Sequence, residues 1–192
     1  MSKLTPLMAF AVVLLLAALA FGQSPSDRTI DNDLVHRQFG ADFTLVSEMP
    51  PVFGDLDGDG IEDVVIAARC KNPMLSQGEF NYTVIDPYYD FFGYGDPRVT
   101  TTFSEPDPAR RGLMILIIHG AAGPDGWRSA HPKAKYVVVN LPYRTISVRK
   151  MKLKKKTIEA VYVEEAGEIG DSSALFFDGR KFRYVPMGGE MQ

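Results

Sequence analysis

The sequence contains a single cysteine, Cys70, and only three histidines. Because one thiol cannot close an internal disulfide, the stability of the chain must come from a hydrophobic core, a bound ion or both. Zinc sites need cysteine or histidine ligands, so this scarcity also argues against zinc. Cys70 follows an apolar stretch and has no histidine close to it in sequence, which predicts an inert thiol rather than a nucleophile.

The chain also has little excess of one charge over the other, since its 21 basic and 24 acidic residues give a net charge of -3. A mildly acidic protein is a poor electrostatic match for nucleic acid, so we expect no nucleic-acid partner. The exception is a cluster of lysine and arginine at residues 149–156. We interpret it as a solvated strand and turn, with contact to an anionic surface or glycan as the alternative.

Long apolar runs are confined to the N-terminus, where residues 7–21 follow Lys3 and precede a polar stretch. The run is shorter than the roughly 20 apolar residues of a membrane span, and it ends in small residues. This pattern predicts a signal peptide over residues 1–22, cleaved after Gly22 or after Ala20, with an uncleaved anchor as the alternative. We therefore expect a secreted or periplasmic protein without a stable membrane span after cleavage.

Helical periodicity is rare and occurs only at residues 31–39, where Asp31 or Asn32 begins the predicted helix and Gly40 ends it. This helix belongs to an N-terminal segment, residues 23–42, which precedes one β-rich domain over residues 43–192. Segments rich in β-branched and aromatic residues predict strands at 43–48, 63–69, 113–119, 135–140, 145–149, 157–164, 174–177 and 181–186. The last two flank Asp178-Gly179, which predicts a two-residue hairpin turn.

Two stretches, residues 64–68 and 113–118, are continuously apolar, which predicts central strands buried on both faces. The insertion between them, residues 71–111, is rich in proline and aromatic residues. Loops of this length are usually functional or disordered, and this one is too aromatic for simple disorder, so we expect it to pack on the sheet. Its tyrosines form a candidate binding surface, with burial in the core as the alternative: Tyr82, Tyr88, Tyr89 and Tyr94.

Acidic residues are concentrated in one loop, residues 55–63, which reads Asp-Leu-Asp-Gly-Asp-Gly-Ile-Glu-Asp. Calcium binds six to eight oxygen atoms in flexible geometry. The loop offers the carboxylates of Asp55, Asp57, Asp59 and Asp63 and the backbone carbonyl of Ile61. Glycines between the aspartates permit the tight path that points successive carboxylates inward. Magnesium demands stricter octahedral geometry, so calcium is the predicted ion, and a solvated turn without metal is the alternative.

The spacing differs from that of an EF-hand, because loop position 12 is Ile66 instead of glutamate and a strand follows instead of a helix. Residues 51–68 resemble the calcium loop of FG-GAP and VCBS repeats, the integrin alpha-like family. The resemblance implies a loop that joins two antiparallel strands and binds calcium through its aspartates. It covers a single copy, whereas a propeller needs at least about four blades. We therefore predict a mainly β, single-domain twisted antiparallel sheet or small sandwich, and not a complete propeller.

Two catalytic patterns are present in outline. Residues 116–123 and 170–174 resemble parts of an α/β-hydrolase site, but every histidine precedes the candidate serine, which is the wrong order for that fold. His119 is therefore predicted to be structural. A group of carboxylates near one strand end could serve glycoside hydrolysis, although a solvated acidic turn is the simpler interpretation: Glu164, Glu165, Glu168 and Asp171.

Together these patterns predict an exported, non-catalytic, calcium-binding β-domain that acts in binding or assembly at the cell envelope or outside the cell. Its partner is an unidentified protein or glycan. Two alternatives remain, namely a glycan-binding module that uses the aromatic insertion and a small carbohydrate-active hydrolase.

Overall fold

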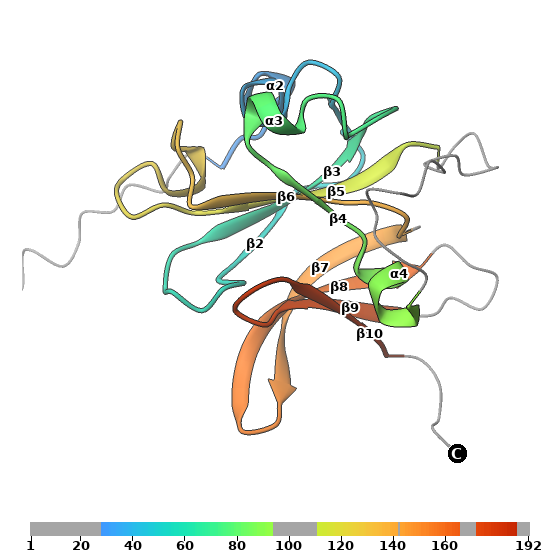
Figure 1. The fold of residues 1–192 in the computed structure, drawn as a ribbon. Coiled ribbons are helices and arrows are strands. Elements are labelled where there is room, and N and C mark those ends of the chain that lie inside the picture. The colour runs from blue at the N-terminus through green and yellow to red at the C-terminus, as the bar shows by residue number, and fades with distance from the viewer. Residues whose placement is uncertain (1–27, 94–110, 142, 166–171, 188–192) are drawn as a thin grey trace, which may run out of the picture.

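Two β-sheets form the body of the protein (Figure 1). The computed structural model describes residues 28–93, 111–141, 143–165 and 172–187. Its elements are, in chain order, α2 (Asn32–Phe39), β1 (Thr44–Leu45), β2 (Val52–Gly54), β3 (Asp63–Arg69), α3 (Gln77–Phe80), β4 (Thr83–Ile85), α4 (Pro87–Phe92), β5 (Leu113–His119), η3 (Gly126–Arg128), β6 (Ala134–Val138), β7 (Tyr143–Leu153), β8 (Lys156–Glu165), β9 (Ser172–Phe177) and β10 (Phe182–Pro186).

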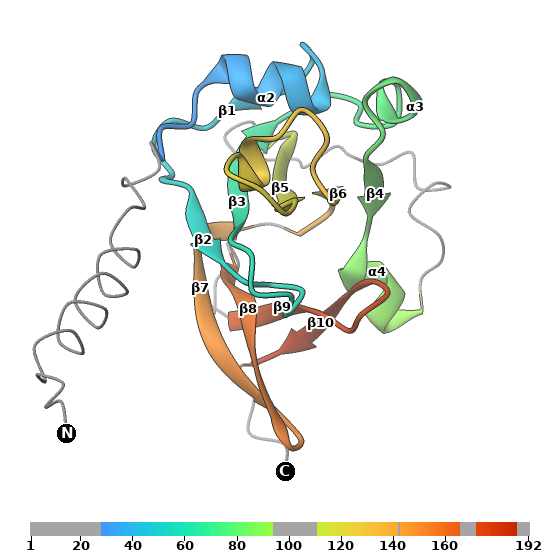
Figure 2. The same cartoon turned by 90° about the vertical axis from the view of Figure 1, so that its left-hand side faces the viewer.

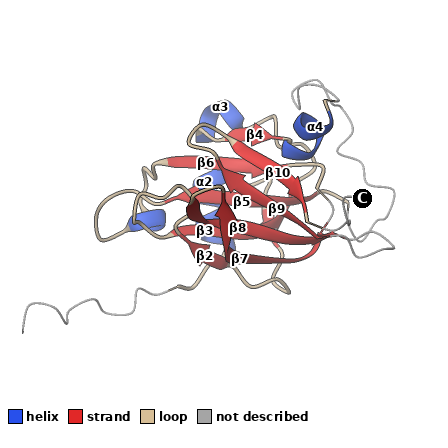
Figure 3. Cartoon of the chain, turned by 90° about the horizontal axis from the view of Figure 1, so that it is seen from below, coloured by secondary structure: helices blue, strands red, loops and turns tan. Residues whose placement is uncertain are grey.

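The first sheet has the strand order β1-β3-β5-β6-β4, with β2 also paired to β3, and the second has the order β10-β9-β8-β7. The predicted mainly β fold is therefore confirmed. Figure 3 shows α3 and α4 beside the strands, whereas α2 is seen behind them. No helix in the described ranges is both long and apolar enough to cross a membrane. The predicted signal peptide, residues 1–22, lies outside those ranges.

The centre of the first sheet consists of β3 and β5, the two continuously apolar segments. They pair antiparallel, with Ile66 opposite Leu116. Successive side chains of a strand point to opposite faces, so Ile66 packs in a cluster under α2, whereas Val65 packs in the cluster that faces the second sheet. Both faces are thereby buried, which explains why these strands lack the usual polar alternation.

Helix α2 covers the outer face of the first sheet (Figure 1). It begins after Asp31, whose side chain accepts a 2.8 Å hydrogen bond from the backbone N–H of Leu34. It ends at Gly40, which has a φ of 105°. Phe39, on its last turn, is fully buried. The helix predicted at residues 31–39 is confirmed.

The second sheet contains a long antiparallel hairpin, β7–β8, in which Leu153 lies opposite Lys156. Figure 2 shows this hairpin extending away from the first sheet. It carries the basic cluster, whose charged members are all exposed: Arg149, Lys150, Lys152, Lys154, Lys155 and Lys156. The prediction of a solvated strand and turn is confirmed for this cluster.

The strand predicted at residues 43–48 is wrong in length, since only Thr44 and Leu45 pair with β3. Phe43 instead packs its ring 5.6 Å from that of Tyr82, in the core under α2. After Leu45 the chain turns, and the N–H of Met49 donates to the carbonyl of Val46. Burial of one aromatic ring and an early turn therefore shorten the strand.

The C-terminal hairpin is present, but its turn lies one residue later than predicted. The N–H of Asp178 donates to the carbonyl of Lys181 at 3.0 Å, so the two central residues are Gly179 and Arg180. Gly179 has a φ of 94°, and the Asp178 carboxylate accepts the N–H groups of Arg180 and Lys181. The carboxylate thus acts as the acceptor that organises the turn.

The described part of the insertion packs on the first sheet, as expected, because Met74, Phe80 and Tyr82 lie in or against the hydrophobic cluster under α2. It also adds a strand to that sheet. Strand β4 pairs with β6 at the sheet edge, with Val84 opposite Val137, and this pair is parallel. The expectation of a purely antiparallel sheet is wrong for this one pair. Helix α4 then lies against β10, where the rings of Tyr88 and Tyr184 have centroids 5.3 Å apart. Residues 94–110 of the insertion lie outside the described ranges.

Candidate metal centre

The aspartate loop is the connection between β2 and β3, which form an antiparallel hairpin with Gly54 opposite Asp63. This is the local arrangement that the resemblance to calcium-binding repeats implies. Gly58 and Gly60 adopt φ angles of 77° and 85°, a region that other residues rarely occupy. The two glycines let the loop reverse direction tightly.

Three of the predicted ligands converge. Asp55, Asp57 and Asp63 each offer an oxygen atom, and these atoms all lie within 4.8 Å of one another. Calcium contacts oxygen at about 2.3–2.6 Å, so ligand oxygens on opposite sides of the ion are roughly 5 Å apart. The spacing of the three carboxylates and their all-oxygen chemistry therefore fit a calcium ion.

Asp63 is the buried member of this triad, with 1% of its surface exposed. Its two carboxylate oxygens accept backbone N–H groups from Leu56 and Gly120, each at 2.8 Å. Burial raises the pKa of Asp63 to about 7, and the neighbouring charges of Asp57 and Asp59 act in the same direction. Asp63 thus connects the loop to the end of β5 and places a carboxyl group in a poorly solvated position.

Asp55 organises the loop from within. Its carboxylate accepts the N–H groups of Gly58, Asp59 and Gly60 at 2.8–3.0 Å. Its own N–H donates to the Glu159 carboxylate on β8, at 2.7 Å. The loop is therefore attached to the second sheet through its backbone as well as to the first sheet through its side chains.

Lys133 pairs with the two central aspartates of the loop. Its Nζ lies 2.7 Å from Asp57 Oδ2 and 2.6 Å from Asp59 Oδ2. These contacts raise the pKa of Lys133 above its ordinary value, and the Lys133 contact lowers the pKa of Asp59. Asp59 does not belong to the convergent triad among the described residues. Ile61 donates its N–H to Asp59 at 2.9 Å, and its carbonyl stays a predicted ligand.

His119 contacts the same loop from the end of β5. Its Nδ1 lies 3.3 Å from Asp57 Oδ2, and the side chain is 1% exposed. Burial lowers the pKa of His119, although the Asp57 charge opposes this shift, and the neutral imidazole is favoured. Its Nε2 has no hydrogen-bond partner among the described residues, and its ring packs edge-to-face on Phe177, with centroids 5.0 Å apart. His119 thus supports Asp57 from a buried aromatic environment.

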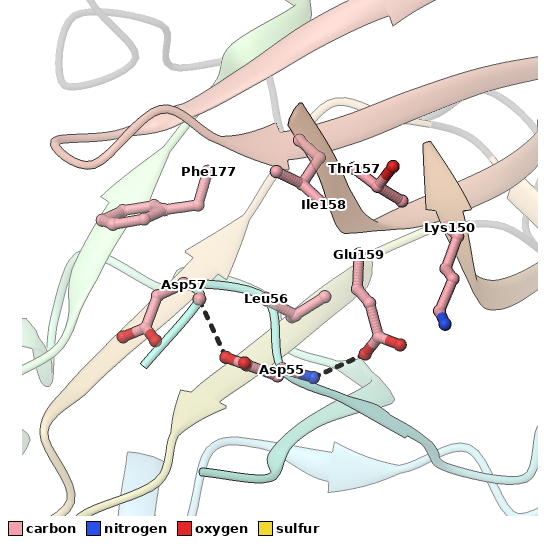
Figure 4. Close-up of a pocket in the computed structure, with 9 residues that line it drawn as sticks. Asp55, Leu56, Asp57, Lys150, Thr157, Ile158, Glu159 and Phe177 are labelled. Carbon is pink, nitrogen blue, oxygen red and sulfur yellow. Dashed lines mark hydrogen bonds between the residues drawn. The ribbon is translucent and has the colours of Figure 1, made fainter. Parts of the chain in front are cut away.

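A cavity of about 260 Å³ lies between the loop and the β7–β8 hairpin. Figure 4 shows Asp55 and Asp57 on one side of it and Glu159, Thr157 and Lys150 on the other. Its remaining lining residues are Leu56, Gly58, Ile158 and Phe177. Two residues of the triad, Asp55 and Asp57, therefore line this cavity.

The predicted aromatic surface is only partly supported. Tyr82 is 3% exposed and donates its hydroxyl to the carbonyl of Pro73, so its assignment to a binding surface is wrong. Packing beside α2 buries it. Tyr88 and Tyr89 are half-buried on α4, and Tyr94 lies outside the described residues. Among the described residues of the insertion, the most exposed aromatic rings belong to Phe91 and Phe92, at 50% and 46%.

Of the four carboxylates proposed for glycoside hydrolysis, the structure describes the side chain of Glu164 alone. Glu164 is exposed and accepts a hydrogen bond from Thr145, while the side chain of Glu165 and residues 166–171 lie outside the described ranges. Ser172 and Ser173 both lie in β9, the first exposed and the second fully buried, instead of standing on a strand-to-helix turn. Cys70 is buried, and burial raises the pKa of its thiol, which favours the unreactive form.

Sequence reasoning missed the partners of the loop: Gly120, His119, Lys133 and Glu159. All of them are far from residues 55–63 in sequence. Knowledge that β3 pairs with β5 would have identified His119 and Gly120. Val64 lies opposite Ile118 in this antiparallel pair, so the two residues after Ile118 must lie beside Asp63. Lys133 and Glu159 carry no local signal that points to the loop. No family model, curated protein or solved structure matches this chain.

Proposed function

We propose that this chain binds one calcium ion in the loop 55–63, within an exported, non-catalytic β-domain that serves binding or assembly at the cell envelope or outside the cell. The observation that carries the proposal is the convergence of Asp55, Asp57 and Asp63 within 4.8 Å. Asp59 and the carbonyl of Ile61 are the further proposed ligands. A ligand set made only of oxygen atoms favours a hard cation such as calcium over zinc or copper.

The ion would act as a structural link. The backbone of Asp55 contacts Glu159 of the second sheet, and Asp63 contacts Gly120 at the end of β5. Carboxylates that converge without a cation repel one another, by about 1–4 kcal/mol per pair at ~4 Å. Relief of this repulsion would stabilise the loop where the two sheets meet, which suits a domain that has no disulfide.

The test is calcium titration of the chain without residues 1–22. We expect a dissociation constant of about 0.1–1 mM, as in other extracellular calcium modules. At ~1 mM calcium and a ~0.1 mM dissociation constant, the gain is about 1.4 kcal/mol of folding stability. The melting temperature should then rise by roughly 3–6 °C relative to chelator.

Two variants make this experiment specific. Asp57→Asn should abolish the calcium-dependent rise in melting temperature. Asp178→Asn is the matched control, because Asp178 organises a glycine-containing turn as Asp55 does but belongs to no carboxylate cluster among the described residues. It should keep the full calcium response. Absence of binding heat and of a melting shift at ~10 mM calcium, far above the expected dissociation constant, would overturn the proposal.

A glycan-binding role is the second candidate, and the exposure of Phe91 and Phe92 favours it. Exposed rings can stack on the apolar faces of sugars, and Tyr89 on the same helix could contribute. A glycan array should then show signals that Phe91→Ala and Phe92→Ala remove. Leu75→Ala is the matched control, because Leu75 is 74% exposed and lies outside α4. An array without signal would exclude this role for the glycans tested.

A further inference from the structure

Lys133 reaches the aspartate loop from a part of the chain that is distant in sequence. Its ammonium lies 2.7 Å from Asp57 Oδ2 and 2.6 Å from Asp59 Oδ2. Its backbone N–H donates to the carbonyl of His119 at 3.0 Å, and the next residue begins β6. The pairing of β5 with β6 therefore holds the backbone of Lys133 beside the loop.

The same carboxylates are needed by a bound ion. Asp57 belongs to the convergent triad, and Asp59 is a predicted ligand that stands apart from the triad while it contacts Lys133. The Asp57 side chain is only 3% exposed, so water screens its contacts poorly. An ammonium and a divalent cation on one carboxylate repel each other, and the repulsion grows as solvent is excluded.

We infer that Lys133 is a built-in counter-ion that competes with calcium for Asp57 and Asp59 and thereby sets the affinity of the loop. This inference rests on the proposed calcium binding. Without calcium, the ammonium offsets the repulsion among the carboxylates and holds the loop together. When calcium binds, the ammonium has to withdraw from Asp57, and with 47% of its side chain exposed it has solvent to move into.

Loss of the Lys133 charge should therefore have two opposite effects. The fold without calcium becomes less stable, because the carboxylates lose their counter-charge. Calcium binds more tightly, because no competitor has to be displaced. A lysine that merely supported the structure of the loop would change both properties in the same direction, since damage to the loop weakens ion binding as well.

The test compares the wild-type chain with Lys133→Met. Methionine is unbranched like lysine but carries no charge. Titration calorimetry should show an affinity for calcium about tenfold higher in the variant, a readily measured difference. The melting temperature in chelator should be lower in the variant. Lys155→Met is the matched control, because it removes a lysine charge from the exposed tip of the β7–β8 hairpin, and it should change neither value. Lys133→Gln replaces the methionine variant if that variant does not fold.

The outcomes separate this inference from the proposed function. Tighter binding by the Lys133 variant supports both. Binding by the variant alone supports the competition and overturns calcium binding by the natural chain. Equal or weaker binding by the variant overturns the competition and leaves the proposed function in place. Absence of binding by either protein overturns both.

Discussion

Replacing Asp63 with alanine, in the presence of chelator, tests what this side chain contributes to the fold without an ion. Asp63 is 1% exposed, and its two oxygens accept the N–H groups of Leu56 and Gly120 at 2.8 Å. Leu56 and Gly120 are themselves buried. Alanine therefore leaves two buried N–H donors without an acceptor.

The expected loss follows from these two bonds. A buried donor without an acceptor costs about 1–3 kcal/mol, so two donors cost about 2–6 kcal/mol. Removing a buried carboxyl group also removes its own cost of burial, which offsets part of the loss. We expect Asp63→Ala to lower the free energy of unfolding by about 2–4 kcal/mol, a large part of the roughly 5–15 kcal/mol of a typical domain.

Urea denaturation in chelator, followed by circular dichroism, measures this difference. The free energy of unfolding of Asp63→Asn should lie between those of the wild type and Asp63→Ala. The asparagine amide keeps one acceptor oxygen, but its NH₂ group, a donor, faces the other backbone N–H. Asp178→Ala serves as the control, since Asp178 accepts backbone N–H groups in an exposed turn. A loss below about 0.5 kcal/mol for Asp63→Ala, the range of ordinary surface substitutions, would refute the idea that Asp63 fastens the loop to β5.

Two further predictions concern the contact between the sheets and the response to acid. Gly54→Ala should lower the free energy of unfolding by about 1–3 kcal/mol, because the added Cβ would lie 2.5 Å from Glu159 Oε2 and 2.6 Å from Val148 Cγ1. Urea titrations measure this loss. An unchanged unfolding midpoint would contradict the close approach of β2 to the second sheet. The N–H of Lys181 and the Arg183 side chain lower the pKa of Asp178 to about 2, so its contribution to stability is present above pH ~4 and lost as the pH falls toward 2. Carbon-detected NMR titration should show this low pKa, and an ordinary value near 4 would refute it.

The strongest local patterns predicted their elements well. Continuous apolar sequence identified β3 and β5 because burial on both faces removes the need for polar positions. Asp31 and Gly40 marked the ends of α2 because helix termini require an acceptor for free N–H groups and a residue that tolerates positive φ. These signals depend only on neighbouring residues.

Predictions that depend on distant contacts succeeded less well. Tyr82 could not be distinguished from the exposed rings of the insertion, because its burial depends on Phe39 and Phe43 packing against it. The short strand β4 was hidden within the insertion, since a three-residue strand at a sheet edge has little pattern of its own. Its parallel partner, β6, lies about fifty residues later in the chain.

The sequence by itself determined the chemistry of the loop at residues 55–63. Alternating aspartates and glycines specify carboxylates on a tight turn, whatever surrounds them. Only the tertiary structure decided how these carboxylates are used. It buried Asp63 against Gly120, left Asp55 and Asp57 close to it, and brought Lys133 between Asp57 and Asp59. Sheet pairing produces these contacts, and pairing joins residues by register across strands and not by distance along the chain.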